Sequence, residues 1–202
     1  MPRPKQLASE NQLLVEGNDH RNFFEAMTEY LSIENIQIQD FGGVNELGRF
    51  LPAFVSMSDF DTVRSIGIVR DAEGSAQSAF QSVQSSLRRA KLPQPRRPEE
   101  RTDKNPAVTV LILPNSNRPG MLETLLRESF RGTAVDQCIH DYLQCIEVLP
   151  DVSIKNQDKA RTHAYLATMP NPHFSIGVAA KNGYWDFDHD VFANIRDFLR
   201  IL

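Results

Sequence analysis

Acidic side chains directly follow two of the apolar segments that read as buried strands. Glu16 comes after residues 12–15, and Asp71 and Glu73 come just after residues 63–69. In an open parallel sheet, ligands bind in the crevice outside the carboxyl ends of the strands, so these acids can meet although they are far apart in sequence. Three carboxylates at one point repel one another unless a cation joins them, and hard oxygen ligands suit Mg²⁺, with Mn²⁺ as a substitute. The pattern therefore predicts a divalent-metal site.

Each acid also has an interpretation without chemistry. A Val-Glu-Gly sequence is common, and the run from Arg70 to Glu73 could supply an N-cap and first-turn acids for the helix that follows. Asp19 could cap the first helix or share the metal. His20 lies one helical turn after Glu16, where it could touch metal or phosphate or simply pack.

The elements that must position these acids alternate between strands and helices. This order predicts right-handed crossovers and a mostly parallel four-stranded sheet flanked by helices, an α/β fold. Strands are predicted at 12–15, 36–41, 63–69 and 108–113, and helices at 19–31, 76–90 and from an N-cap at Asn45 to residue 54. Beyond Pro114 the pattern is mainly helical, at 121–130, 135–148, 156–167 and 188–202, with one short strand at 174–179. We therefore expect a core at 10–115 and a helical C-terminal extension at 116–202 packed on it.

Composition excludes several classes of protein. No apolar run reaches the roughly 18–20 residues of a membrane span, and the N-terminus lacks the apolar region of a secretory signal, so a cytoplasmic protein without membrane contact is expected. Cys138 and Cys145 lie two turns apart on a predicted helix, about 10 Å, which predicts reduced thiols that pack within the helical region. The chain has no glycine-rich phosphate loop, dinucleotide fingerprint or nucleophile elbow.

Charge is unevenly distributed. The net charge of −4 argues against a charge-driven nucleic-acid coat protein but not against a nuclease, because metal-binding carboxylates lower the net charge. Residues 91–107, rich in proline and charge, predict a flexible surface loop. Basic residues around it could contact a phosphate backbone or only be solvated: Arg88, Arg89, Lys91, Arg96, Arg97 and Arg101. The acidic run from Asp186 to Asp190 could bind metal, although its place before the last helix favours capping.

Five segments of the chain together resemble the TOPRIM domain shared by topoisomerases, bacterial primases and several nucleases. They are LLVEGND, QDFGGVNEL, SIGIVRDAEGSAQSAF, LILPNSNRPGMLETLL and GVAAKNGYWDFDHDVF. The chain is most similar to a small, stand-alone, TOPRIM-related family of bacterial proteins of unknown function, related to the overcoming-lysogenization-defect type of TOPRIM nuclease. The resemblance implies a TOPRIM, Rossmann-like fold.

The resemblance also assigns roles to individual residues. Glu16 matches the strand-one glutamate, a metal ligand or general acid/base, and Asp71 matches the first aspartate of the Asp-x-Asp motif. Glu73 stands where the second aspartate usually is, and its side chain is one methylene longer. Glu123 is similar to a further acidic metal position, and Lys159 to a lysine that stabilises charge at phosphate. Glu123 could instead be a first-turn helix acid, and Lys159 a solvated side chain.

The function implied is Mg²⁺-dependent hydrolysis of phosphodiesters in DNA or RNA, with defence against phage or mobile DNA as the setting. The alternative is a non-catalytic or partner-gated subunit of an ABC-type ATPase complex. A homo-oligomer is compatible with either.

Overall fold

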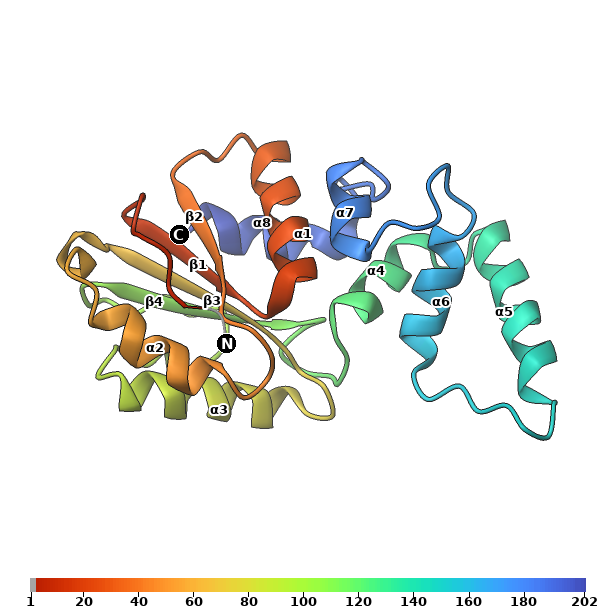
Figure 1. Cartoon of the computed structure of the whole chain (residues 1–202), viewed down its shortest axis with the longest axis horizontal. Coiled ribbons are helices and arrows are strands. Elements are labelled where there is room, and N and C mark those ends of the chain that lie inside the picture. The colour runs from red at the N-terminus through yellow and green to blue at the C-terminus, as the bar shows by residue number, and fades with distance from the viewer. Residues whose placement is uncertain (1–2) are drawn as a thin grey trace.

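A four-stranded, all-parallel sheet forms the centre of the molecule. The computed structural model describes residues 3–202, and the strands are β1 (Asn11–Val15), β2 (Ile36–Asp40), β3 (Ser65–Asp71) and β4 (Ala107–Leu113). Their order across the sheet is β2-β1-β3-β4, as Figure 1 shows. The predicted α/β fold class is thus confirmed, and the carboxyl ends of all four strands lie at the same edge of the sheet.

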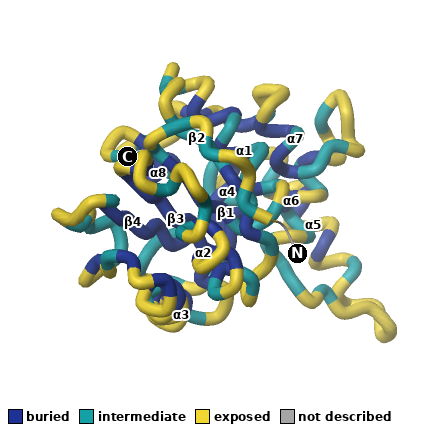
Figure 2. Tube along the Cα trace, turned by 60° about the vertical axis from the view of Figure 1, so that its left-hand side comes forward, coloured by how far each residue is buried: buried dark blue, intermediate teal, exposed yellow. Residues whose placement is uncertain are grey.

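Helices cover both faces of this sheet, which is why β3 and β4 are buried along their whole length and consist mainly of apolar residues. On one face lie α1 (Gly17–Tyr30), α7 (Ile176–Lys181) and α8 (Ala193–Arg200); on the other lie α2 (Leu47–Val55) and α3 (Ala76–Arg89) (Figure 1). Each face buries its own apolar cluster, seen as the dark blue interior in Figure 2.

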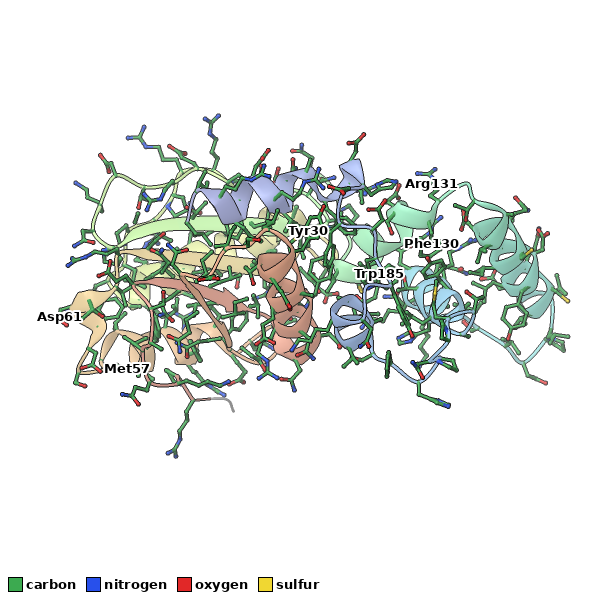
Figure 3. The ribbon with its side chains drawn as sticks, turned by 90° about the horizontal axis from the view of Figure 1, so that it is seen from above. Tyr30, Met57, Asp61, Phe130, Arg131 and Trp185 are labelled. Atoms are coloured by element: carbon green, nitrogen blue, oxygen red, sulfur yellow. The ribbon has the colours of Figure 1, made fainter. Side chains whose placement is uncertain are left out.

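The C-terminal helices first leave the sheet and then return to it. Helices α4 (Leu122–Phe130), α5 (Ala134–Glu147) and α6 (Gln157–Leu166) extend beyond the carboxyl edge (Figure 1), and α7 and α8 close over the α1 face. The ring of Tyr165 stacks between Phe130, with centroids 4.1 Å apart, and Trp185, at 5.4 Å; Phe130 and Trp185 are labelled in Figure 3. The helical region and the α1 face therefore share one core, and a boundary at residue 115 stays a prediction.

Several local predictions were wrong. Residues 174–179 are not a strand: α7 begins there, with Ser175 as N-cap and Ile176, Ala179 and Ala180 buried at helical spacing. So short an apolar run does not distinguish strand from helix. Asn45 does not cap α2, which begins after Glu46 without a side-chain cap, and the last helix is preceded by a separate 3₁₀ turn, η2 (Asp190–Phe192).

Two further expectations are corrected on the surface. The charged loop has no helix or strand, but Glu99 and Thr102 donate backbone hydrogen bonds to Val110 and Val108, so it is attached along the edge of β4. Cys138 and Cys145 are free but exposed, not packed. In the described part of the chain, no helix has the length and apolarity needed to cross a bilayer.

Candidate functional site

A cavity of about 410 Å³ opens at the carboxyl edge of the sheet. All five residues that the sequence singled out line it: Glu16, Asp71, Glu73, Glu123 and Lys159. They come from the ends of β1 and β3, the turn after β3, and the first turns of α4 and α6. The topology explains the convergence, because parallel strands bring their carboxyl ends together and α4 begins close to the same edge.

Asp71, the last residue of β3, is held between two helices. Its Oδ1 lies 3.0 Å from Nε2 of His20 on α1 and accepts a hydrogen bond of 3.0 Å from the backbone N–H of Leu122 on α4. Only 7% of Asp71 is exposed. Both contacts use Oδ1, so Oδ2, which has no hydrogen-bond partner in the described part of the chain, is left for a ligand.

His20 is a buried partner of Asp71 rather than an isolated core histidine. Burial by itself lowers the pKa of His20, but the charge of Asp71 and the hydrogen bond to it outweigh that effect, and the net pKa lies above the ordinary value. The helical spacing from Glu16 correctly placed this ring in the cavity wall, whereas contact with metal or phosphate stays a prediction.

Glu16 faces a buried arginine. Its Oε2 lies 2.9 Å from Nε of Arg70, and Nη1 of Arg70 donates a 2.7 Å hydrogen bond to the carbonyl of Val44. The Glu16–Arg70 contact is an ion pair rather than a directed hydrogen bond, because neither atom has a hydrogen-bond partner among the described residues. Burial raises the pKa of Glu16, and Arg70 only partly opposes the rise.

Arg70 was missed as a site residue by sequence reasoning. The signal was present, since an arginine inside an otherwise apolar buried strand needs a partner. Successive strand residues point to opposite faces, so Arg70 reaches toward the loop before α2 while Asp71 reaches α1.

Glu73 has a backbone conformation that non-glycine residues seldom adopt, with φ of +50°. Two backbone hydrogen bonds of 2.8 Å with Gly120 hold it there. Gly120 has φ of +134°, and a Cβ at this position would lie 2.7 Å from Oγ1 of Thr124. This bridge couples the turn after β3 to the start of α4, and therefore positions Glu73 relative to Glu123.

Glu123 and Lys159 form a third pair at the cavity. Nζ of Lys159 lies 3.5 Å from Oε1 of Glu123, which is 9% exposed. Thr162 donates a 3.1 Å hydrogen bond to the backbone carbonyl of Glu123, and Thr124 one of 2.7 Å to Asp158. These contacts fix α6 against α4, so the lysine is held beside the cavity.

Asp40 is a second residue that the sequence did not identify. Its Oδ1 accepts hydrogen bonds from the backbone N–H of Gly17, at 2.8 Å, and of Gly42, at 2.6 Å. Gly17 has φ of +85°, which favours glycine. Asp40 thus ties the turn after β1 to the turn after β2 beside Glu16.

Other acids serve structural contacts. Asp19 does not cap α1; its side chain accepts hydrogen bonds from the hydroxyl of Ser175 and the backbone N–H of Gly177, joining α1 to α7. In the acidic run, Nδ1 of His189 accepts a hydrogen bond from the backbone of Val191 at η2. These contacts favour the capping interpretation of that run.

The side chains that line the cavity are of the types that bind a divalent cation. Several carboxylates line one cavity, and among residues 3–202 neither Oε2 of Glu16, which is buried, nor Oδ2 of Asp71 has a hydrogen-bond partner. In the arrangement described for residues 3–202, however, no three His, Cys, Asp or Glu side chains form a group that could hold a metal. Arg70, His20 and Lys159 instead each pair with one of the carboxylates.

Comparison with solved structures identifies proteins with a similar fold. The chain superimposes on the C-terminal region of the Xanthomonas campestris pv. campestris OLD protein with a TM-score of 0.51 and 11% identity, over 96% of both chains. The C-terminal region of the Burkholderia pseudomallei OLD protein gives a TM-score of 0.49 and 12% identity, over 96% of this chain and 98% of that one. A comparison with curated proteins found no match. The first superposition confirms the expected resemblance to the overcoming-lysogenization-defect type at the level of the fold.

One family profile spans nearly the whole chain. The profile described as "Protein of unknown function (DUF3226)" matches residues 10–202, so the chain belongs to this family.

Proposed function

We propose that the chain is a metal-dependent phosphodiesterase that hydrolyses DNA or RNA. The observation that carries the proposal is a cavity at the carboxyl edge that Glu16, Asp71, Glu73, Glu123 and Lys159 line together. Carboxylates can hold a metal ion that activates water and polarises a phosphate, and an amine can stabilise the charge that develops there. The resemblance of the two acidic motifs to TOPRIM nucleases supports the same activity.

Asp71 and Glu73 would hold Mg²⁺, with Glu16 and Glu123 as further ligands. Bound there, Mg²⁺ would supply polarisation of the phosphate and a lower pKa for an attacking water. The hydrogen bonds from His20 and Leu122 orient Asp71. Lys159 supplies positive charge for the scissile phosphate.

Glu16 suits the transfer of a proton. Burial raises its pKa, which favours the protonated carboxyl that a general acid needs, while Arg70 supports the ionised form. The Glu16 side chain can therefore be either protonated or ionised during the reaction.

The ion pairs favour a second candidate, a site that is gated by a partner or has lost its chemistry. Arg70 and Lys159 each pair with a carboxylate and His20 contacts a third, so a metal that joins these acids requires the side chains to move. In the gated case, a partner such as an ABC-type ATPase would supply that rearrangement.

Calorimetric titration of Mg²⁺ and Mn²⁺ into the wild type and Asp71→Asn, followed by plasmid nicking and RNA cleavage assays, tests both candidates. Glu29→Gln, on the exposed end of α1, is the matched control. Saturable binding and cleavage that are both lost in Asp71→Asn alone support the nuclease. Binding without cleavage supports the gated site. No binding at millimolar metal rejects the metal site.

A further inference from the structure

We propose that the exposed face of α3, together with the basic loop that follows it, binds the phosphodiester backbone of a nucleic acid and leads it to the carboxyl-edge cavity. This inference rests on the proposed function only for the choice of nucleic acid as the partner. The surface is called the α3 track here, and it consists of Ser75, Gln77, Ser78, Gln81, Ser82, Ser85, Arg88 and Arg89, continued by Lys91, Arg96, Arg97, Arg101 and Lys104.

The track begins at the candidate site. A groove of about 320 Å³ is lined by Asp71 and Glu73 at one end and by Ser75, Ser78 and Ser82 along α3. Asp71 and Glu73 also line the carboxyl-edge cavity. A chain lying in the groove would therefore reach the residues that are proposed to hold the metal.

The middle of the track carries hydrogen-bonding groups and no charge. Residues 74–87 include no Asp, Glu, Lys or Arg, and the side chains of α3 exposed to solvent there are those of glutamine and serine. Hydroxyl and amide groups commonly donate to phosphate oxygens, and no carboxylate on this face would repel a phosphate. The 14 residues of α3 extend about 21 Å, the length of about six nucleotides at 3.4 Å each.

The far end of the track is strongly basic. Residues 88–104 contain seven Lys or Arg and three Asp or Glu, a net charge of +4, in a chain whose total is −4, so the rest of the chain carries −8. Among the described residues, Arg97 is the one of these seven that forms an ion pair, 3.7 Å from Glu100. The loop also encloses a cavity of about 520 Å³ lined in part by Arg96, Arg101 and Lys104.

These observations favour a nucleic acid over simple solvation of the loop. Unpaired cations release counterions when they meet phosphates, which drives binding that does not depend on sequence. The exposed α3 face has no aromatic side chain to stack on bases, so recognition would be of the backbone. Attachment of the loop to β4 keeps the basic end in a fixed position relative to α3.

Fluorescence anisotropy measures nucleic-acid binding by the α3 track in the absence of metal. The wild type is titrated, in EDTA, into labelled 12-nucleotide single-stranded DNA, single-stranded RNA of the same sequence, and the DNA duplex. The variants are Arg88→Glu/Arg89→Glu at the basic end and Ser82→Glu in the groove. The control Arg131→Glu/Arg200→Glu makes the same change in net charge at exposed arginines outside the track.

We expect the Arg88→Glu/Arg89→Glu variant to bind at least about tenfold more weakly, and its log–log salt slope to fall in magnitude by about 1.4 for two lost phosphate contacts on a single strand. Ser82→Glu should weaken binding severalfold, and the control should stay within twofold of the wild type. Equal weakening in the control, or no binding by the wild type, overturns the proposal. If nucleic-acid binding follows the expected pattern but the protein binds no metal, the α3 track is supported and the proposed nuclease activity is rejected. Comparison of the three probes shows whether single-stranded DNA, single-stranded RNA or duplex DNA binds most tightly.

Discussion

Replacing Arg70 by methionine tests whether Glu16 depends on its buried counter-ion. The two side chains are 5% and 10% exposed and 2.9 Å apart, so removing the guanidinium leaves a carboxylate with little access to water. Breaking a buried pair from one side costs about 3–5 kcal/mol, because the remaining charge stays desolvated. The second contact of Arg70 contributes less, since Val44 is 39% exposed and water can reach its carbonyl. We expect Arg70→Met to lower the free energy of unfolding by about 3–5 kcal/mol at pH 7.5.

The stability lost in Arg70→Met should increase as the pH rises. Burial already raises the pKa of Glu16, and without Arg70 nothing comparable opposes it. A carboxyl whose folded-state pKa lies above its unfolded value binds more protons when folded, so stability falls as the pH rises through that window. The Arg70→Met penalty should therefore be smaller at pH 5 than at pH 7.5.

Urea unfolding followed by fluorescence of the single tryptophan, Trp185, measures these differences, because this side chain is only 3% exposed in the folded protein. The double variant Glu16→Gln/Arg70→Met has no orphaned charge and should recover most of the loss. The reasoning would be refuted if Arg70→Met lowered the free energy of unfolding by less than about 1 kcal/mol, which is the contribution of an exposed ion pair. It would also be refuted by a double variant as unstable as the single one.

Two further predictions concern the α1 face. Gly177→Ala should destabilise the fold by about 1–3 kcal/mol in urea unfolding, because an added Cβ would lie 2.5 Å from the backbone oxygen of Asp19; an unchanged midpoint would show that α7 can shift. The His20–Asp71 pair should stabilise the protein fully below pH 6.5, the ordinary pKa of histidine, and this contribution should be lost as the pH rises through the raised pKa of His20. His20→Gln should remove that dependence between pH 6 and 8, and a variant that keeps the same slope would show that another group causes it.

The positions of Glu16 and Asp71 could be predicted because the ends of strands are visible in the local sequence. The alternating order of strands and helices then predicted a parallel sheet. Continuous apolar runs ending in Glu16 and Asp71, separated by helical patterns, determine a parallel sheet whose carboxyl ends meet. Glu123 was implied only by the resemblance to the TOPRIM domain, and it lines the same cavity. The 174–179 segment was misassigned as a strand because the period of its apolar residues is ambiguous over so few positions.

The partners of these acids were decided by the tertiary structure. Arg70 meets Glu16, and His20 meets Asp71, because neighbouring residues of β3 point to opposite faces of the sheet and each face brings a different element to the cavity. Lys159 reaches Glu123 only because α6 packs on α4 through side chains whose pairing no local pattern specifies. The sequence by itself indicated that Glu16, Asp71 and Glu73 gather at the carboxyl edge, because they follow the ends of parallel strands, but it did not identify Asp40 in the same cavity. Which side chain pairs with each acid follows from long-range packing, since the partners come from different helices and strands.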